Sequence, residues 1–355
     1  MFIIENVAKL RVLSHKDQHK TMAWPNLLKT LAEKKKKNQI HVAVLSANDY
    51  NTDYETLNWM QKSFKSVWAL LAWTISFFGA IGNWLFVKHS KLGREIKRLR
   101  ASHLALEKIY TYSPDITKNK SWFDRKLTHI LLNFLNAKAV RNRLKLVKKK
   151  LRQAILALDK KEITIASLAS GSARAVVEVL SELQNNGCSI KFTVILVDAS
   201  KNAIKYSEKL AKEYGIENSV NWIRVHGMLE DFIKNGNAYP PDIVEMVGIM
   251  DYYGQNDNYY QLEALDVVSQ IYNIMQERGY LITCNIRDNI ERIFMVNILL
   301  WKMVYREPED LAEIALASGF EAEDCEIIYE PLKIHGLLVC RKMPWWPLPK
   351  KKPTD

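Results

Sequence analysis

The sequence predicts an α/β protein with a doubly wound, mostly parallel sheet that follows an N-terminal helical extension. From residue 163 onward, runs of β-branched and aliphatic residues alternate with amphipathic stretches, which is typical of parallel strands joined by helices. A tight turn of small residues joins the first strand to the first helix. Near the end of the chain, two apolar runs follow each other without a helix between them. They predict a closing antiparallel hairpin at the edge of the sheet.

The first strand and helix set the pattern that later elements repeat. Residues 163–168 are aliphatic and β-branched, whereas residues 173–183 place apolar side chains at three- and four-residue steps, which is helical spacing. Gly215 and Gly319 each close a later helix. Further strands are expected at 191–197, 220–225, 242–247, 280–285, 326–329 and 334–340, and further helices at 201–214, 257–276 and 308–317.

A long amphipathic helix is expected before the sheet. Within residues 122–158, apolar residues such as Leu144 and Leu151 recur at helical steps. We expect this stripe to pack against the sheet, while the basic residues between them, Arg143 included, form a solvated face. The chain then divides into a basic helical region at 1–120, a sheet domain at 121–343 led by this helix, and a basic tail at 344–355.

Charge and cysteine usage limit the expected partners and compartment. The 355 residues carry a formal net charge of +12, which favours anionic partners such as nucleic acid or an acidic membrane surface. No nucleic-acid-binding motif accompanies the charge, so nucleic acid is the less favoured partner. The four cysteines are widely spaced and form no Cys-x-x-Cys pair, which indicates a reducing cytoplasm and argues against a metal site. The N-terminus lacks the pattern of a signal peptide.

One uncharged segment, residues 66–87, suggests contact with a membrane. It runs for 22 residues between two lysines, and Trp68 and Trp84 lie near its ends, as in many membrane helices. The alternative is a buried helix or hairpin that covers the sheet domain. Basic residues follow at 88–100, and the tail at 344–355 combines two tryptophans with lysines. We therefore expect monotopic or peripheral attachment, rather than a full span, at the inner, cytoplasmic face of an anionic membrane.

The turn after the first strand is the main candidate for a ligand site. Small side chains let a ligand approach the backbone, and the helix that follows offers free N–H groups. A dinucleotide fingerprint is disfavoured because Arg174 stands where its third glycine belongs, and no Gly-Lys-Ser/Thr follows for a nucleotide P-loop. The candidate binding residues of the turn are Ser167, Ala169, Ser170 and Gly171.

This turn resembles the first motif of class I S-adenosylmethionine methyltransferases, D-x-G-x-G-x-G. Its four fixed places fall on Ser167, Ala169, Gly171 and Ala173, of which only Gly171 is kept. The replacements are small, so the loop can still admit a methionine moiety. Ser167 stands where the motif has its acidic residue. One contact with the cofactor that the resemblance implies therefore lacks its usual carboxylate. A plain βα turn of another α/β protein remains the alternative.

The ends of the next strands are implied to complete a cofactor site. Asp198, followed by Ala199, ends the second strand, where an acidic residue can accept hydrogen bonds from ribose hydroxyls. The alternative for Asp198 is a helix N-cap. Gly227 and Met228 end the third strand, where class I enzymes place residues against the adenine, although a methionine there is often core. Gly248 ends the fourth strand.

The second half of the chain carries the sharper resemblance. Its segments 246–254, 279–285, 287–292 and 301–306 look like those of bacterial class I methyltransferases that include the synthases of 3-hydroxy fatty acid methyl esters. The resemblance covers roughly residues 122–341. It implies a Rossmann-like fold, S-adenosylmethionine as cofactor, and methyl transfer to a small or lipid-like acceptor such as a fatty acid carboxylate.

Such an acceptor defines what the chain must supply. A carboxylate is ionised at neutral pH and needs no base, but it does need a cation, and arginine can hold it with two parallel bonds. Arg287 follows the fifth strand, and Tyr252 and Tyr253 follow the fourth; these three are the candidate catalytic residues. Arg292 and Arg306 are further candidate cations. The alternatives are that each arginine forms an ordinary ion pair and that one tyrosine belongs to the core.

Two other functions stay open from the sequence. A degenerate domain that binds a ligand without turnover, tethered at a membrane, is favoured by the replacements at Ser167 and Ala169. The retained Asp198 and the segment 248–254 favour an active methyltransferase. A nucleic-acid methyltransferase is supported by charge alone, because the fourth strand does not end in an Asn/Asp-Pro-Pro-Tyr motif.

Overall fold

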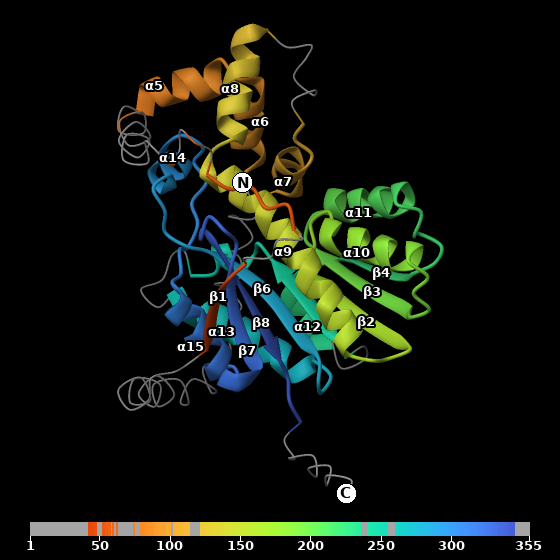
Figure 1. The fold of residues 1–355 in the computed structure, drawn as a ribbon. Coiled ribbons are helices and arrows are strands. Elements are labelled where there is room, and N and C mark those ends of the chain that lie inside the picture. The colour runs from red at the N-terminus through yellow and green to blue at the C-terminus, as the bar shows by residue number, and fades with distance from the viewer. Residues whose placement is uncertain are drawn as a thin grey trace, which may run out of the picture. The chain divides into compact units, whose positions relative to one another are not determined.

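The computed structural model describes residues 42–47, 52–57, 59, 62, 74, 79–100, 102–113, 121–235, 240–254 and 260–344. Within these residues the chain forms an eight-stranded sheet in the order β1-β7-β8-β6-β5-β2-β3-β4 (Figure 1). Only β8 runs antiparallel to its neighbours β6 and β7. The strands are β1 (Ala43–Ser46), β2 (Glu162–Leu168), β3 (Lys191–Asp198), β4 (Asn221–His226), β5 (Ile243–Val247), β6 (Tyr280–Ile286), β7 (Cys325–Tyr329) and β8 (His335–Arg341).

Helices cover both faces of the sheet, which confirms the doubly wound fold (Figure 1). One face packs against α9 (Leu135–Ala157), α10 (Arg174–Asn185) and α11 (Lys201–Glu213). The other packs against α12 (Leu229–Asn235), α13 (Tyr260–Ile274) and α15 (Pro308–Ala317). Two short 3-10 turns, η4 (Met250–Tyr252) and η5 (Ala322–Asp324), follow β5 and precede β7. The central strands are apolar on both faces because helices exclude water from both.

The N-terminal region contributes a strand that the sequence did not indicate. β1 pairs in parallel with β7, with Ala43 opposite Glu326 and Ser46 opposite Tyr329. The predicted helices do lie before residue 120, but a strand lies there as well. Within the described residues the edge of the sheet is β1, so the prediction that the closing hairpin β7-β8 forms this edge is wrong. β1 has only four residues, all exposed, so no alternation of apolar and polar residues marked it. It covers the hydrogen-bonding edge that β7 would otherwise leave open.

A helical cap with its own apolar core lies at one end of α9 (Figure 1). We use "cap" for α6 (Lys91–Leu99), α7 (His103–Tyr110), α8 (Trp122–Leu132), the first six residues of α9 and α14 (Arg292–Asn297). The short α5 (Gly79–Asn83) and the π-helical turn η1 (Trp84–Lys88) precede it. Ile96, Leu131, Val140 and Phe294 come from different cap segments and share one buried cluster, the cap cluster. Burial of these side chains, rather than helix propensity, holds such short helices together.

Helix α9 connects the cap to the sheet. It has 23 residues and so spans about 35 Å at 1.5 Å per residue. Val140 belongs to the cap cluster, whereas Leu151 and Ile155 pack on the sheet. The apolar stripe therefore packs as expected, but Arg143 is buried rather than solvated.

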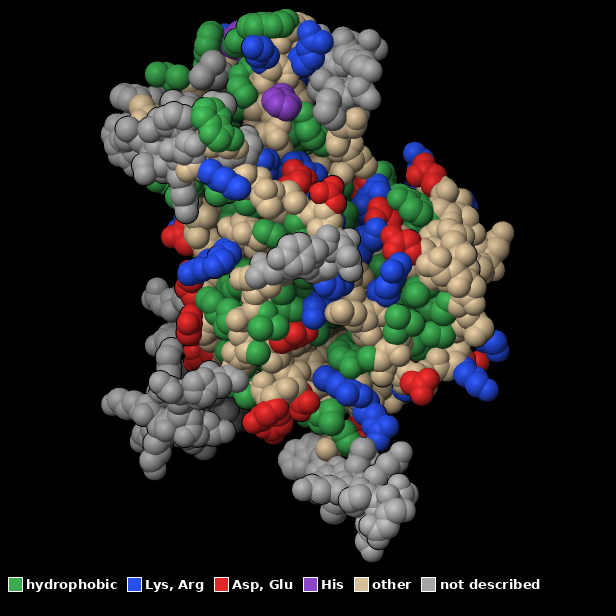
Figure 2. Space-filling model, viewed as in Figure 1, with side chains coloured by type: hydrophobic (Ala, Val, Ile, Leu, Met, Phe, Trp, Pro, Cys, Tyr) green, Lys and Arg blue, Asp and Glu red, His purple; other side chains and the backbone are tan. Residues whose placement is uncertain are grey.

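The face over α9 and α10 mixes acidic and basic side chains despite the positive net charge (Figure 2). Lys148 pairs with Glu178 and Glu182, and Arg152 also pairs with Glu182. Basic residues of α9 are thus neutralised by acids of α10. This part of the surface is not the uniform basic stripe that nucleic-acid binding requires.

The sequence features that suggested membrane contact are described only in part. Most of segment 66–87 and the tail from residue 345 lie outside the described residues. Phe86 is buried in the cap cluster. Trp84, in η1, and Trp122, in α8, are exposed. No helix within the described ranges is both long and apolar enough to cross a bilayer. Contact with an anionic membrane surface stays a prediction, which sedimentation with anionic vesicles can check.

The N-terminus of α9 is capped by a residue that is distant in sequence. Phe134 occupies the N-cap position and offers no side-chain acceptor. The buried Glu291 replaces it, because its Oε1 accepts from the N–H of Leu135 at 2.8 Å and its Oε2 accepts from the N–H of Asn136 at 2.9 Å. A carboxylate at this end of a helix also interacts favourably with the helix dipole. Glu291 thus holds the segment before α14 against the start of α9.

We predict that Glu291→Gln lowers the free energy of unfolding by about 1–3 kcal/mol, because one buried N–H loses its acceptor. Urea denaturation measures this change. The control is Glu162→Gln, which removes a carboxylate from an exposed ion pair with Lys191 and should cost almost nothing. Equal stabilities of the two variants would contradict the capping role.

Candidate active site

The turn between β2 and α10 has the backbone of a glycine turn although glycine occupies only one of its special positions. Ala169, Gly171 and Ala173 have φ angles of +50°, +55° and +51°. These are the three glycine places of the D-x-G-x-G-x-G motif. An alanine in the left-handed region costs roughly 1–2 kcal/mol, so the fold holds this geometry against local preference. The hydroxyl of Ser170 is buried, and no hydrogen-bond partner is found for it among the described residues.

Asp198, at the end of β3, is bound to the turn. Its Oδ2 accepts from the N–H of Gly171 at 2.8 Å, and its Oδ1 accepts from the N–H of Ser200 at 2.7 Å. The N-cap of α11 is Ser200, not Asp198. An ionised carboxylate has about four acceptor positions, so Asp198 keeps two for a ligand.

The end of β4 lies beside the end of β3. The N–H of Gly227 donates to the carbonyl oxygen of Asp198 at 3.1 Å. Ala199 is exposed and Met228 is half-buried. The structure therefore brings the residues predicted at the first three strand ends to one edge of the sheet, as the carboxyl ends of parallel strands require.

Helix α7 of the cap lies across the turn. A Cβ placed on Gly171 would approach the Cβ of His103 to 3.3 Å. Glu107 is buried and accepts from the Ser172 hydroxyl at 2.6 Å, from Arg174 Nε at 3.0 Å and from the Tyr206 hydroxyl at 3.0 Å. Arg174, which stands where a dinucleotide fingerprint has its third glycine, thus binds α7 of the cap to the turn. No motif in the sequence marked either His103 or Glu107.

A second buried carboxylate lies beneath the turn. Ser167, on β2, is opposite Glu245 on β5, and its hydroxyl donates a hydrogen bond to the Oε2 of Glu245. Burial raises the pKa of Glu245 to about 7, although the hydrogen bond from Ser167 and the charge of Arg143 act to lower it.

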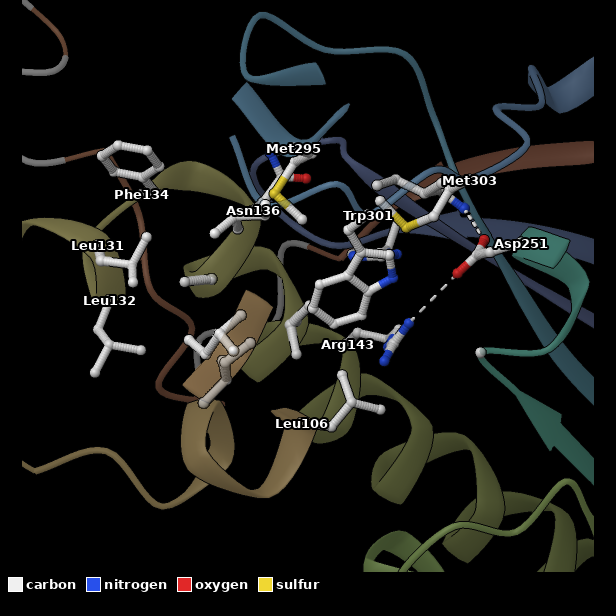
Figure 3. A pocket seen from close by; sticks show the side chains of 18 of the residues that line it. Leu106, Leu131, Leu132, Phe134, Asn136, Arg143, Asp251, Met295, Trp301 and Met303 are labelled. Atoms are coloured by element: carbon white, nitrogen blue, oxygen red, sulfur yellow. Dashed lines mark hydrogen bonds and ion pairs between the residues drawn. The ribbon is translucent and has the colours of Figure 1, made fainter. Parts of the chain in front are cut away.

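A cavity of about 60 Å³ lies between the cap and the carboxyl end of β5. Figure 3 shows Arg143 and Asp251 at one end of it, with Leu131, Leu132 and Phe134 at the other. Its apolar wall comes from α6, α7, α8 and the loop around α14. The lining also includes Asn136, near Met295, and a group of residues from α9, from the segment after β5 and from β8: Arg143, Gly248, Asp251, Tyr252 and His335.

Arg143 brings a buried positive charge to this cavity. Its Nη2 donates to the Tyr110 hydroxyl at 3.2 Å, and its Nη1 lies 3.9 Å from Asp251 Oδ2. Its Nε is buried and has no hydrogen-bond partner within the described residues. Burial acts to lower the pKa of the guanidinium, but Tyr110, Cys284 and Asp251 together raise it above its ordinary value, so the group stays charged. A guanidinium has five N–H donors, and this one is only partly satisfied.

Gly248 and Asp251 shape the polar end of the cavity. Gly248 has a φ of +97°, and a Cβ there would lie 3.9 Å from both terminal nitrogens of Arg143. Asp251 accepts from the N–H of Ile286 at 2.8 Å, which fixes its carboxylate to the end of β6. Burial raises the pKa of Asp251, and Arg143 opposes this shift.

His335, at the start of β8, is buried beside the same cavity. Burial lowers its pKa well below the ordinary value, and the charge of Arg143 adds to this shift, so the ring is neutral at pH 7. Its Nδ1 lies 3.9 Å from the sulfur of Cys284. Its Nε2 has no hydrogen-bond partner among the described residues.

The predicted catalytic residues fall in three different places. Tyr252 lines the cavity, and its hydroxyl accepts from Trp301 Nε1 at 2.7 Å. Tyr253 instead packs against the main core of the sheet. Arg287 is 39% exposed and pairs with Glu307 at 2.5 Å, and it does not line the cavity.

The other two candidate arginines also have partners elsewhere. Arg292 pairs with Asp288 at 3.3 Å on the surface. Arg306 is buried and donates to the carbonyl oxygens of Met250 and Tyr253. The guanidinium in the cavity therefore comes from Arg143, before the sheet. A signal existed, because Arg143 lies three residues after Val140 and four before Val147, on the apolar face of its helix.

The eight-stranded, mostly parallel sheet with helices on both faces is the Rossmann-like fold typical of class I methyltransferases. A family model described as "Putative methyltransferase" matches residues 30–327, and the chain belongs to that family. The match begins at residue 30, so the cap lies within it. No curated protein sequence matches the chain.

Among solved structures, the chain is similar to a possible exported protein from Bordetella parapertussis. The TM-score is 0.61 at 11% identity, over 80% of this chain and 97% of that one, which shows a shared fold. A magnesium protoporphyrin IX methyltransferase from Synechocystis PCC 6803 with bound SAM gives a TM-score of 0.45 at 11% identity, over 71% of this chain and 96% of that one. An O-methyltransferase family 2 protein from Planctomyces limnophilus in complex with apigenin gives 0.42 at 12% identity, over 85% and 100%.

We predict that Ala169→Gly raises the free energy of unfolding by up to about 1 kcal/mol. Relief of the left-handed strain, worth roughly 1–2 kcal/mol, exceeds the extra unfolded-chain entropy of glycine, about 0.4–1 kcal/mol. Thermal or urea denaturation measures the change. Ala199→Gly is the control, since Ala199 is exposed after the neighbouring strand and does not have a positive φ; it should destabilise slightly. Destabilisation by both variants would show that the turn is not strained.

Proposed function

We propose that the protein transfers a methyl group from S-adenosylmethionine to the carboxylate of an apolar acid, such as a fatty acid. Family membership supports methyl transfer. The geometry of the turn supports the methyl donor, and the buried guanidinium of Arg143 supports the acceptor. The finer assignment, to the synthases of 3-hydroxy fatty acid methyl esters, rests on sequence resemblance alone.

The residues of the turn fit the proposed donor. The free acceptor positions of Asp198 suit two ribose hydroxyls, and the buried, unpartnered hydroxyl of Ser170 suits a polar ligand group. Gly227 and Met228 lie next to Asp198 and offer a surface for a purine ring. When bound there, S-adenosylmethionine supplies an electrophilic methyl group at the carboxyl ends of β2 and β5.

Arg143 carries the proposal for the acceptor. A buried guanidinium with an unpartnered Nε is costly, and it faces a cavity whose other walls are mostly apolar. A carboxylate on an apolar chain satisfies both features, because its oxygens can pair with the guanidinium and its chain can lie among the cap side chains. Gly248 lines the cavity close to Arg143 and directly follows β5, so such a carboxylate would lie near the donor.

The chain then has to align the reactants and exclude water. A carboxylate is ionised at neutral pH, so its oxygen needs no base to attack the methyl carbon. Arg143 would fix its orientation, and orientation of this kind supplies much of the rate. The apolar cap would keep water out of the cavity, which strengthens the ion pair.

A hydroxyl acceptor is the second candidate because of His335. A hydroxyl must lose a proton as it is methylated, and a neutral imidazole with a free nitrogen can take it. His335 has both properties and lines the same cavity. The incompletely hydrogen-bonded guanidinium of Arg143 favours the carboxylate, since a neutral hydroxyl brings no negative charge to it.

The donor site predicts the behaviour of Asp198→Ala. This variant should bind S-adenosylmethionine more weakly by about 1.5–3 kcal/mol, the range for hydrogen bonds to a charged group, as measured by calorimetry. Glu162→Ala removes a carboxylate at the opposite end of β2 and should leave the affinity unchanged. Folded wild-type protein that binds no S-adenosylmethionine at millimolar concentration would remove the proposed function.

The acceptor site predicts the behaviour of Arg143→Lys. With a medium-chain fatty acid as acceptor, kcat/KM should fall about ten- to a hundredfold, because an ammonium group cannot make two parallel bonds. Mass spectrometry of the methyl ester measures the product, and a thermal melt checks the fold. Arg287→Lys is the matched control and should change little, since Arg287 is exposed and paired with Glu307.

The choice of acceptor also separates the two candidates. Methylation of a fatty alcohol but not of the acid, together with a loss of activity in His335→Gln, would replace the carboxylate by a hydroxyl. Activity on the acid that survives in His335→Gln but not in Arg143→Lys would support the carboxylate.

A further inference from the structure

A buried carboxylate lies beside the turn without an assigned role. Glu245 is 7% exposed and sits near the carboxyl end of β5, two residues before its last residue, Val247. Ser167 stands directly opposite on β2 and is fully buried. Residues opposite each other on neighbouring strands share one face of the sheet. The hydrogen bond from the Ser167 hydroxyl therefore holds the carboxylate at the base of the turn.

The charge of this carboxylate lacks a cation of its own. The charge of Arg143, on α9, acts to lower the pKa of Glu245. Within the described residues, however, the salt bridge of Arg143 is with Asp251. Hydrogen bonds from Ser167 and from the backbone of Val247 take up part of its acceptor capacity. Burying an ionised carboxylate without a close cation costs several kcal/mol. That cost shows in its pKa, which burial raises to about 7, and a cation bound nearby would restore the ionised form.

The position of Glu245 indicates which cation it would meet. Ser167 occupies the acidic place of the D-x-G-x-G-x-G motif, and the carboxylate bonded to it stands one strand away. The site thus holds a buried acid on β5, bonded to the residue at which the motif has its acid on β2. The turn that begins after β2 is the proposed donor site, and the donor carries a cationic ammonium group on its methionine part.

We propose that Glu245, positioned by Ser167, binds the ammonium group of the methyl donor. This inference rests on the proposed function, because it assumes that the donor occupies the turn. An ammonium has three N–H donors, and a carboxylate that accepts one of them forms a charge-assisted hydrogen bond. The sulfonium of the donor has no N–H or O–H to donate, so the ammonium is the better partner.

Calorimetry on the full chain with two probes tests this assignment. S-adenosylhomocysteine keeps the ammonium but lacks the sulfonium, and 5′-methylthioadenosine lacks both the ammonium and the amino-acid carboxylate. Glu245→Gln should weaken binding of S-adenosylhomocysteine about tenfold or more, which is the effect of about 1.4 kcal/mol, and leave binding of 5′-methylthioadenosine unchanged. A structural role for Glu245 would weaken both probes alike and would overturn the proposal.

Moving the acid back provides a second test. The double variant Ser167→Asp with Glu245→Ser keeps a hydroxyl bonded to a carboxylate but returns the acid to β2. It should recover most of the affinity for S-adenosylhomocysteine that Glu245→Gln loses. Glu330→Gln is the control for burial, because Glu330 is also fully buried but accepts from the backbone of Leu332 and Ile334; it should not change the ratio of the two affinities.

The outcomes separate this inference from the proposed function. Wild-type protein that binds neither probe contradicts the function itself. Wild-type protein that binds both, with Glu245→Gln unchanged toward S-adenosylhomocysteine, contradicts only the role of Glu245. If the double variant does not fold, the selectivity of Glu245→Gln between the two probes still decides.

Discussion

A guanidinium buried in the middle of α9 is the constraint around which the site is arranged. Arg143 cannot lose its proton, so the fold must surround its charge with acceptors. Asp251 approaches from the segment after β5, and Tyr110 from the cap. These contacts join the cap and the sheet at one point of the helix that connects them. The hydrogen bonding of the guanidinium is incomplete, because its Nε has no partner among the described residues. The same side chain lines the mostly apolar cavity.

Helix α7 connects the two halves of the site through its opposite sides. His103 and Glu107, one turn apart, meet the turn between β2 and α10, whereas Leu106 and Ile109 line the cavity beside Arg143. This separation follows from the helical period, which places residues i and i+4 on one face. A single short helix therefore borders both the turn and the cavity, and the contacts of Glu107 hold this helix against the turn. The cap is part of the site rather than an appendage to the sheet.

The sequence by itself determined the sheet and the edge at which the site lies. Strand and helix periods differ, so the alternation after residue 163 was visible without any knowledge of tertiary contacts. The carboxyl ends of parallel strands meet at one edge, so the sequence predicted that Gly171, Asp198 and Gly227 lie close together. The hydrogen bonds of Asp198 with Gly171 and Gly227 confirm this. Local chemistry marked these positions because small residues, an acid and a glycine stand directly after apolar strands.

Only the tertiary structure decided which charges face the site. Arg143 and Arg287 are the same residue type, and their roles differ because burial takes one out of water and leaves the other with Glu307 at the surface. The pairing of Ser167 with Glu245 depends on the register of two strands that are 78 residues apart in the chain. Strand β1 likewise depends on a free edge of β7. Local sequence fixes periodicity and turn chemistry, but neighbours across the fold fix burial, and burial decides what a charged side chain can bind.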